Sequence, residues 1–211
     1  MILIDRTKTY VKQTLEKDSS GHDWPHVRRV HHHALMIAQE EGGDLLVIEL
    51  AALLHDIADW KFHRGDDSVG PHVAREWLQK MDVAPDVTEH VCSIIASMSF
   101  KGAKTISAKL TLEGQIVQDA DRLDAIGAIG IARAFAYGGF SGQPMHDEKL
   151  LPKSHQSFED YKSSKTTTIN HFYEKLLLLK DRMNTATAKQ LAEDRHEFLE
   201  VYLNRFLSEW S

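Results

Sequence analysis

The sequence predicts an all-α protein, a single-domain helical bundle. Apolar residues recur at helical spacing along nearly all of the 211 residues, and the period-two alternation typical of strands is almost absent. A chain of this length can bury about 70% of the surface that its unfolded state exposes, so one core is enough to fold it. The single cysteine, Cys92, lies in an apolar helical segment and is expected in that core.

The first half of the chain divides into helices at residues that typically begin or end them. Pro25 suits a first helical turn, and Gly42–Gly43 is typical of a helix end. Asp44 can cap the helix that follows, because its carboxylate can accept hydrogen bonds from the first free N–H groups. The expected helices span residues 3–15, 25–41, 44–57, 72–81 and 85–98.

The second half is expected to contain longer helices. A strongly apolar helical stretch runs over 108–137, and the glycines within it allow close helix packing or a bend. Residues 138–157 are rich in glycine, proline and serine without a clear period, which is typical of a functional lid or a disordered loop. Two long helices are expected over 165–210, separated near Asn184, with Thr185 as a possible N-cap.

Composition and charge exclude several classes of protein. The net charge of −6 lacks the positive excess of a general nucleic-acid binder. The longest apolar stretches fall far short of the ~20 residues that cross a bilayer. Residues 1–9 mix apolar and charged side chains, unlike a signal peptide. We therefore expect a cytoplasmic monomer or homodimer without a nucleic-acid or membrane partner.

Thirteen histidines are many for a chain of this length, and some of them stand near carboxylates in otherwise apolar helices. Residues three or four apart share one face of a helix, so the second helix brings His26, Arg29 and His33 onto one face, with His22 four residues before His26. The other residues of interest are His55 and Asp56 at the end of the next helix, and Asp119, Asp121 and Asp124 in a later apolar segment.

This combination of side chains favours a divalent-metal site. A buried carboxylate is costly unless it is paired, hydrogen-bonded or bound to a metal. Imidazoles and carboxylates on facing helices of a bundle are a typical set of metal ligands. Each feature alone has a simpler explanation: His55 as a core histidine, or Asp121 and Arg122 as a surface ion pair. His31 and His32 are expected to face solvent.

His26, the doublet His55–Asp56 and Asp121 resemble the H…HD…D signature of the HD-domain metal-dependent phosphohydrolase superfamily. The resemblance covers almost the whole chain, from about residue 20 to 210. It implies one HD-type domain over 1–211, with a metal-site core over about 20–135 and a C-terminal helical portion over 160–211. The segments most similar to the YedJ/YpgQ-like bacterial branch span residues 21–30, 119–130 and 169–177.

The resemblance implies one divalent metal ion, held by His26, His55, Asp56 and Asp121. Four protein ligands leave about two positions of an octahedral shell for water or substrate oxygens. Mn²⁺ is the expected ion, with Mg²⁺, Fe²⁺, Co²⁺ or Ni²⁺ as alternatives. A second metal is disfavoured, because residues 94–99 lack the His-His pair that two-metal relatives have at this place.

The resemblance also implies an activity, the hydrolysis of a nucleoside triphosphate to its monophosphate and pyrophosphate. Asp59, three residues after Asp56, either activates the attacking water as a base or only caps the helix end. Arg29 and Lys101 are candidates to bind phosphate oxygens. His22 would either support the ligand His26 or face the substrate.

Other activities remain open on the sequence alone. The superfamily also contains nucleoside-monophosphate phosphatases and cyclic-nucleotide phosphodiesterases, and the sequence does not select a base or a sugar. Hydrolysis of (p)ppGpp is disfavoured, because Ala58–Asp59 replaces the acidic pair of that group. A different class is a metal-containing HD module that senses a nucleotide without converting it.

Overall fold

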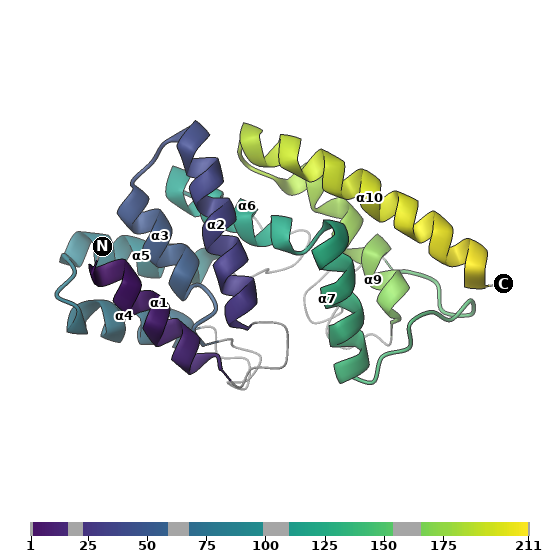
Figure 1. Ribbon diagram of the computed structural model, residues 1–211, viewed down its shortest axis with the longest axis horizontal. Coiled ribbons are helices and arrows are strands. Elements are labelled where there is room, and N and C mark those ends of the chain that lie inside the picture. The colour runs from purple at the N-terminus through teal and green to yellow at the C-terminus, as the bar shows by residue number, and fades with distance from the viewer. Residues whose placement is uncertain (1, 17–22, 59–67, 99–109, 154–165, 211) are drawn as a thin grey trace. The chain divides into compact units, whose positions relative to one another are not determined.

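The structure is a computed structural model, and it describes residues 2–16, 23–58, 68–98, 110–153 and 166–210 (Figure 1). All regular secondary structure within these ranges is helical, so the predicted all-α class is confirmed. No helix within them is both long and apolar enough to cross a lipid bilayer. The described residues form two compact units, the first ending at Ala120 and the second beginning at Asp121. That the chain is a single domain stays a prediction.

The first unit contains the helices predicted for the first half of the chain, within a few residues at each end. Asp44 caps its helix as predicted, because its Oδ1 accepts hydrogen bonds from the N–H groups of Leu46 at 2.9 Å and Val47 at 3.3 Å. The helices are α1 (Ile2–Thr14), α2 (Trp24–Glu41), α3 (Leu45–Leu54), α4 (Val69–Lys80), α5 (Pro85–Met98) and the beginning of α6 (Leu112–Asp124).

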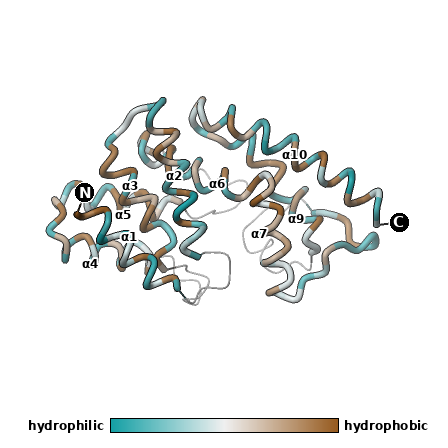
Figure 2. Tube along the Cα trace, in the orientation of Figure 1, coloured by the Kyte–Doolittle hydropathy of each residue, from teal (hydrophilic) through white to brown (hydrophobic). Residues whose placement is uncertain are grey.

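Helix α3 forms the centre of the first unit. It contacts α1, α2 and α5, and seven of its ten residues are buried. A helix that is apolar on all sides has to be surrounded by other helices, as α3 is. Hydrophilic and hydrophobic residues are mixed along α2 (Figure 2), and its buried residues recur three or four positions apart, which places them on one side of the helix. Cys92 of α5 is buried, as predicted.

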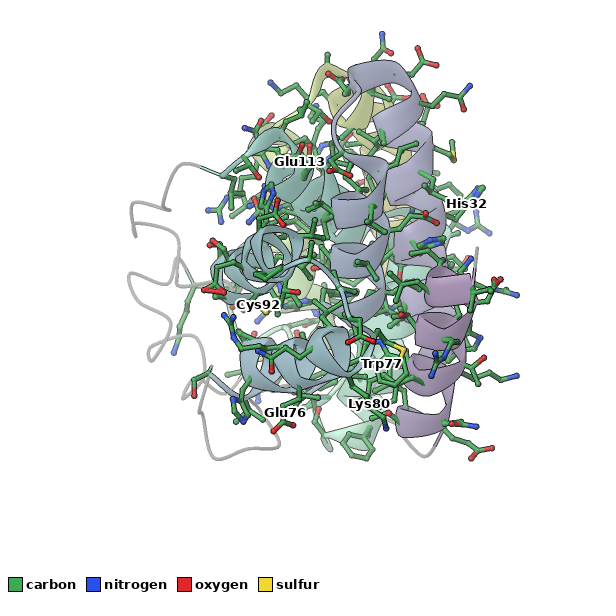
Figure 3. The ribbon with its side chains drawn as sticks, turned by 90° about the vertical axis from the view of Figure 1, so that its left-hand side faces the viewer. His32, Glu76, Trp77, Lys80, Cys92 and Glu113 are labelled. Atoms are coloured by element: carbon green, nitrogen blue, oxygen red, sulfur yellow. The ribbon has the colours of Figure 1, made fainter. Side chains whose placement is uncertain are left out.

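Aromatic packing fastens α1 to α4. The rings of Tyr10 and Trp77 are stacked, with centroids 4.0 Å apart and planes 4° from parallel. Trp77 Nε1 donates a hydrogen bond to the buried hydroxyl of Thr7 at 3.0 Å. Figure 3 shows Trp77 between the two helices. This contact holds the N-terminal helix against the unit that carries the candidate site.

The expectation that His31 faces solvent is wrong. Its side chain is buried, and its Nε2 lies 3.0 Å from Oε1 of Glu49 on α3. His31 comes four residues after Val27 and three before Ala34, which are both fully buried, so it lies on the same side of α2. His32 is exposed, as expected (Figure 3).

Burial of His31 predicts a pH dependence of stability. Burial lowers the pKa of His31 below its ordinary 6.5, the nearby Lys8 adds to this, and the hydrogen bond to Glu49 opposes it. The unfolded chain therefore takes up the proton first as the pH falls, so this contribution to stability is present above the ordinary pKa and is lost below it. His31→Gln keeps a donor for Glu49 but does not titrate. In urea titrations between about pH 7.5 and 5.5, it should lose less stability than the wild type.

The exposed His72, which lies on α4, provides the matched control for this experiment. His72→Gln removes a histidine without changing a buried one, so its loss of stability with falling pH should equal that of the wild type. An unchanged slope in His31→Gln would show that protonation of His31 is not coupled to unfolding.

The second unit is built around α7 and α10. Helix α10 contacts α7 and η3, and α7 contacts α9. The rings of Phe135, Phe172, Tyr202 and Phe206 form an aromatic cluster, with neighbouring centroids 5.9–6.1 Å apart, in which Phe172 is buried and the others are half-buried. After the end of α6, the elements are α7 (Gly127–Phe140), α9 (Thr168–Glu174), the 3₁₀ turns η2 (Leu176–Leu178) and η3 (Lys180–Arg182), and α10 (Ala186–Trp210).

The predicted helical stretch over 108–137 is two helices, α6 and α7, with a bend between them. The bend requires a glycine, because Gly127 has φ +72°, which other residues rarely adopt. The loop predicted over 138–157 begins after Phe140, and its described part, up to residue 153, is hydrogen-bonded to α9. Asn170 Nδ2, for example, donates to the carbonyl of Leu150 at 2.8 Å.

The prediction of a long helix between residue 165 and Asn184 is wrong. Helix α9 ends at Glu174, because Lys175 has non-helical angles of φ −142° and ψ −57°, and the 3₁₀ turns follow. A 3₁₀ turn places residues three apart on one side, which buries Leu176 and Leu179 together. The second long helix is confirmed as α10.

Candidate metal centre

Three predicted metal ligands converge in the first unit. His26 Nε2 lies 3.3 Å from His55 Nε2 and 3.3 Å from Asp56 Oδ2, and the last two atoms are 3.4 Å apart. His26 and His55 are buried, whereas the side chain of Asp56 is 17% exposed. Two imidazole nitrogens and one carboxylate oxygen thus form a nearly equilateral triangle at the end of two helices.

His26 is placed by the first turn of α2. Asp23 is the N-cap, and its Oδ1 accepts a hydrogen bond from the backbone N–H of His26 at 2.9 Å. Pro25 occupies the first turn, where its missing N–H costs no helical hydrogen bond. The turn therefore fixes the backbone of His26, whose ring is fully buried.

His55 is placed by the last turn of α3, where it is the C-cap residue. Its Nδ1 lies 2.9 Å from the carbonyl oxygen of Ala52, so this nitrogen carries the proton and Nε2 keeps its lone pair. The C-terminal end of a helix carries partial negative charge, which favours a cation. The local structure thus presents the basic nitrogen of His55 at a place suited to a metal ion.

The three atoms fit a divalent cation. Neighbouring ligands about 2.1 Å from an octahedral ion lie about 3.0 Å apart, close to the triangle observed here. Imidazole and carboxylate donors suit Mn²⁺, Fe²⁺ and related ions, and a facial triad of this kind leaves the other positions open. Among the described residues, the group of donor atoms close enough to share an ion consists of His26, His55 and Asp56.

The structure does not place the other predicted site residues in this group. Asp121 lies in the last turn of α6, within the second unit, and is half-buried. Arg29 lies on α2 three residues after His26 and is also half-buried. Asp59, Lys101 and His22 lie outside the described residues. The roles of these five residues stay predictions.

The sequence did not single out the ion pair that involves Asp124. This carboxylate is 1% exposed, and its Oδ2 lies 2.9 Å from Nη1 of Arg133 on α7. Arg122, expected to pair with a neighbouring aspartate, donates a hydrogen bond to the carbonyl of Arg182. Asp124 thus forms a buried ion pair with Arg133, whereas the hydrogen bond of Arg122 is to a backbone carbonyl.

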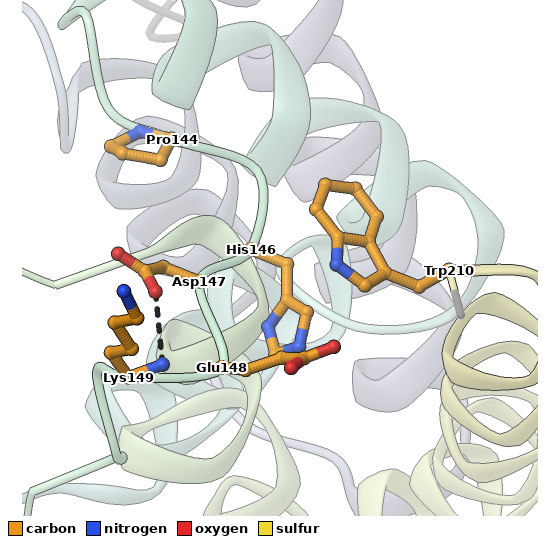
Figure 4. Close-up of a pocket in the computed structure, with 6 residues that line it drawn as sticks. All are labelled: Pro144, His146, Asp147, Glu148, Lys149 and Trp210. Atoms are coloured by element: carbon orange, nitrogen blue, oxygen red, sulfur yellow. Dashed lines mark hydrogen bonds between the residues drawn. The ribbon is translucent and has the colours of Figure 1, made fainter.

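A pocket in the second unit is separate from the predicted residues. It is an open pocket with a volume of about 330 Å³, lined by Pro144, Trp210 and the segment 146–149 (Figure 4). The ring of His146 packs edge-on against that of Trp210, with centroids 5.3 Å apart. Of the predicted site residues that the structure describes, none lines this pocket.

The comparisons with known proteins identify the family. The model of the HD domain matches residues 24–126, a range that includes all four predicted metal ligands. Bacillus subtilis YpgQ is 42% identical over 92% of this chain and 87% of its own. In its crystal structure with ADP, it covers 98% of this chain and 97% of its own, with a TM-score of 0.77.

Two further crystal structures agree with this result. An HD-superfamily hydrolase from Bacillus thuringiensis is 45% identical, covers 98% of this chain and 96% of its own, and has a TM-score of 0.76. A protein from Lactobacillus plantarum is 40% identical, covers 99% and 97%, and has a TM-score of 0.88. The chain belongs to the HD-domain family and has the fold of the HD-superfamily hydrolases.

Proposed function

We propose that this protein is a divalent-metal-dependent phosphohydrolase that cleaves a nucleoside triphosphate to its monophosphate and pyrophosphate. The observation that supports it is the triangle of His26 Nε2, His55 Nε2 and Asp56 Oδ2, with sides of 3.3–3.4 Å. Asp121, which the sequence resemblance adds as the fourth ligand, completes the proposed set. The proposed ion is Mn²⁺, one per chain.

A divalent cation held here would polarise a phosphoryl oxygen and make a bound water more acidic. His26 and His55 would each offer an imidazole nitrogen to the ion, and the carboxylate of Asp56 would offset part of its positive charge. These residues come from the ends of two packed helices, so little reorganisation is needed when the ion binds. The packing of the two helices therefore holds these three side chains close together before the ion binds.

In the proposed reaction, Asp59 accepts a proton from the attacking water. The water oxygen forms a bond to the α-phosphorus, the bond from this phosphorus to the bridging oxygen breaks, and pyrophosphate leaves with the bonding electrons. Arg29 and Lys101 are proposed to bind phosphate oxygens, Arg29 through its two-pronged guanidinium and Lys101 as a point charge. His22 is proposed to face the substrate.

The proposal that the substrate is a nucleotide has one support outside the sequence. The relative YpgQ, which is 36% identical in the structural comparison and matches nearly the whole chain, has been crystallised with ADP. A nucleoside diphosphate bound to such a similar fold favours nucleotides over other phosphoesters.

A screen of nucleotides tests the proposed activity. Purified protein, treated with a chelator and reloaded with Mn²⁺, is incubated with nucleoside tri-, di-, mono- and cyclic monophosphates, and the products are separated by anion-exchange chromatography. We expect monophosphate and pyrophosphate from a triphosphate, and no turnover before Mn²⁺ is restored. Release of inorganic phosphate from monophosphates, or ring opening of cyclic ones, would replace the proposed reaction with one of the alternatives.

The same screen separates an enzyme from a nucleotide sensor. Asp59→Ala should reduce turnover by about 10²–10⁴-fold, the usual contribution of a general base, while Mn²⁺ binding is kept. A protein that binds Mn²⁺ and a nucleotide but hydrolyses none of the compounds would be a sensing module, and the proposed activity would be wrong.

A further inference from the structure

The last turn of α6 is held by arginine side chains from two other helices of the second unit. Nη1 of Arg133, on α7, lies 2.9 Å from Oδ2 of Asp124 and donates to the carbonyl oxygen of the same residue at 3.3 Å. Nη1 of Arg195, on α10, donates to the carbonyl oxygen of Leu123. Two consecutive residues at the end of α6 thus accept hydrogen bonds from guanidinium groups.

These contacts supply hydrogen bonds to backbone carbonyl groups at the end of α6. The last four carbonyl groups of an α-helix lack partners within the helix, and the protein is destabilised if they are buried without other partners. Arg133 and Arg195 supply partners for two of them, and their positive charge suits the negative end of the helix. Removing either guanidinium would leave buried acceptors without that partner.

The carboxylate at this helix end is buried, and the side chains of Arg133 and Arg195 that reach the helix end are half-buried. Asp124 is 1% exposed, and breaking a buried ion pair by removing one partner is strongly destabilising. Burial lowers the pKa of Arg195, and the charge of the nearby Asp124 opposes this. Because the Asp124 carboxylate is buried, separating it from Arg133 would leave it without this charged partner.

The backbone conformation between α6 and α7 is restricted by close contacts. Gly127 has φ +72°, and a Cβ atom there would lie 3.1 Å from Cγ of Arg195. At Gly130, a Cβ atom would overlap the carbonyl group of Ala125. The helix end, the bend and the Arg195 side chain are therefore packed in direct contact.

We propose that Arg133 and Arg195 are positioning residues, which hold the last turn of α6 so that Asp121 is placed to bind the metal ion. Asp121 lies one turn before Asp124 on the same helix, so a clamp on residues 123–124 fixes the backbone that carries it. This inference rests on the proposed function, because it takes Asp121 to be the fourth ligand. The arginines act through the helix and do not contact the ion themselves.

The test compares Mn²⁺ affinity and metal-free stability in conservative variants. Arg133→Lys and Arg195→Lys keep the positive charge but lose the two-pronged guanidinium. We expect each to raise the dissociation constant for Mn²⁺ about tenfold. This is the lower end of the effect on metal affinity when a residue that supports a metal ligand is changed. Free Mn²⁺ is measured by electron paramagnetic resonance, and the melting temperature of the metal-free variants is recorded alongside. Arg205→Lys is the matched control, since Arg205 lies on α10 in an exposed ion pair with Glu209.

The role through Asp121 is tested in a second background. In Asp121→Ala, the proposed ligand is gone, so Arg133→Lys should weaken Mn²⁺ binding no further. An equal loss in both backgrounds would overturn the positioning role, as would a lower melting temperature with unchanged Mn²⁺ affinity. If Asp121→Ala itself leaves Mn²⁺ affinity unchanged, the fourth ligand is wrong and the inference fails with it. Hydrolysis by the wild type in the nucleotide screen is judged separately from all of these results.

Discussion

His55→Ala should abolish metal-dependent hydrolysis, with kcat/KM reduced by about 10³-fold or more. The substitution removes one of three donor atoms that lie within 3.4 Å of one another, and it leaves Asp56 beside a single imidazole. It also removes the hydrogen bond between His55 Nδ1 and the carbonyl oxygen of Ala52, which orients the ring in the wild type. We expect the protein to fold but to bind Mn²⁺ at least about 100-fold more weakly. Even the loss of a residue that only hydrogen-bonds to a metal ligand lowers metal affinity by about 10–100-fold.

Thermal unfolding with and without Mn²⁺ measures this loss independently of activity. A ligand that binds the folded state at about 100 times its dissociation constant stabilises it by about 2.7 kcal/mol. The wild type should gain stability of this order, and His55→Ala should gain almost none. His72→Ala, at an exposed position on α4, should respond to Mn²⁺ like the wild type. An equal gain in His55→Ala would show that Mn²⁺ binds elsewhere.

Gly130→Ala should destabilise the protein by about 3 kcal/mol or more, one of the larger effects that a single methyl group can have. The added Cβ would overlap the carbonyl carbon and oxygen of Ala125. Backbone atoms cannot rotate away as a side chain does, so the bend between α6 and α7 would have to open. The free energy of unfolding in urea measures the loss.

Gly139→Ala provides a control in the same helix. A Cβ atom at Gly139 would meet no atom within 4 Å, and its φ is not in the left-handed region. Alanine favours the helical state over glycine by up to about 1 kcal/mol, so this variant should be as stable as the wild type or slightly more stable. Similar losses in both variants would contradict the close approach at Gly130.

The sequence predicted the helices whose ends depend on local side chains. Pro25 and Asp44 act within one turn of their own positions, so their effect can be recognised without the tertiary structure. The segment after α9 was different. Its leucines also fit a long helix, whereas the structure has 3₁₀ turns there, with Leu176 and Leu179 buried. Burial depends on the tertiary structure, which the local pattern does not show.

For the candidate site, the resemblance supplied four predicted metal ligands, and three of these residues lie together in the structure. The pair of Asp124 and Arg133 could not be predicted for a geometric reason. On one continuous helix, residues nine apart would be separated by about 13.5 Å along the axis. The bend at Gly127 turns α7 back toward the end of α6 and brings the two side chains within 2.9 Å.

The most direct test of the account is a crystal structure of the protein with Mn²⁺, using the anomalous scattering of manganese to locate the ion. We predict one strong anomalous peak per chain, about 2.2 Å from His26 Nε2, His55 Nε2 and Asp56 Oδ2, with an oxygen of Asp121 as a fourth protein ligand. A peak at other residues, or none beside this triangle at saturating Mn²⁺, would show that the triangle is not the metal centre.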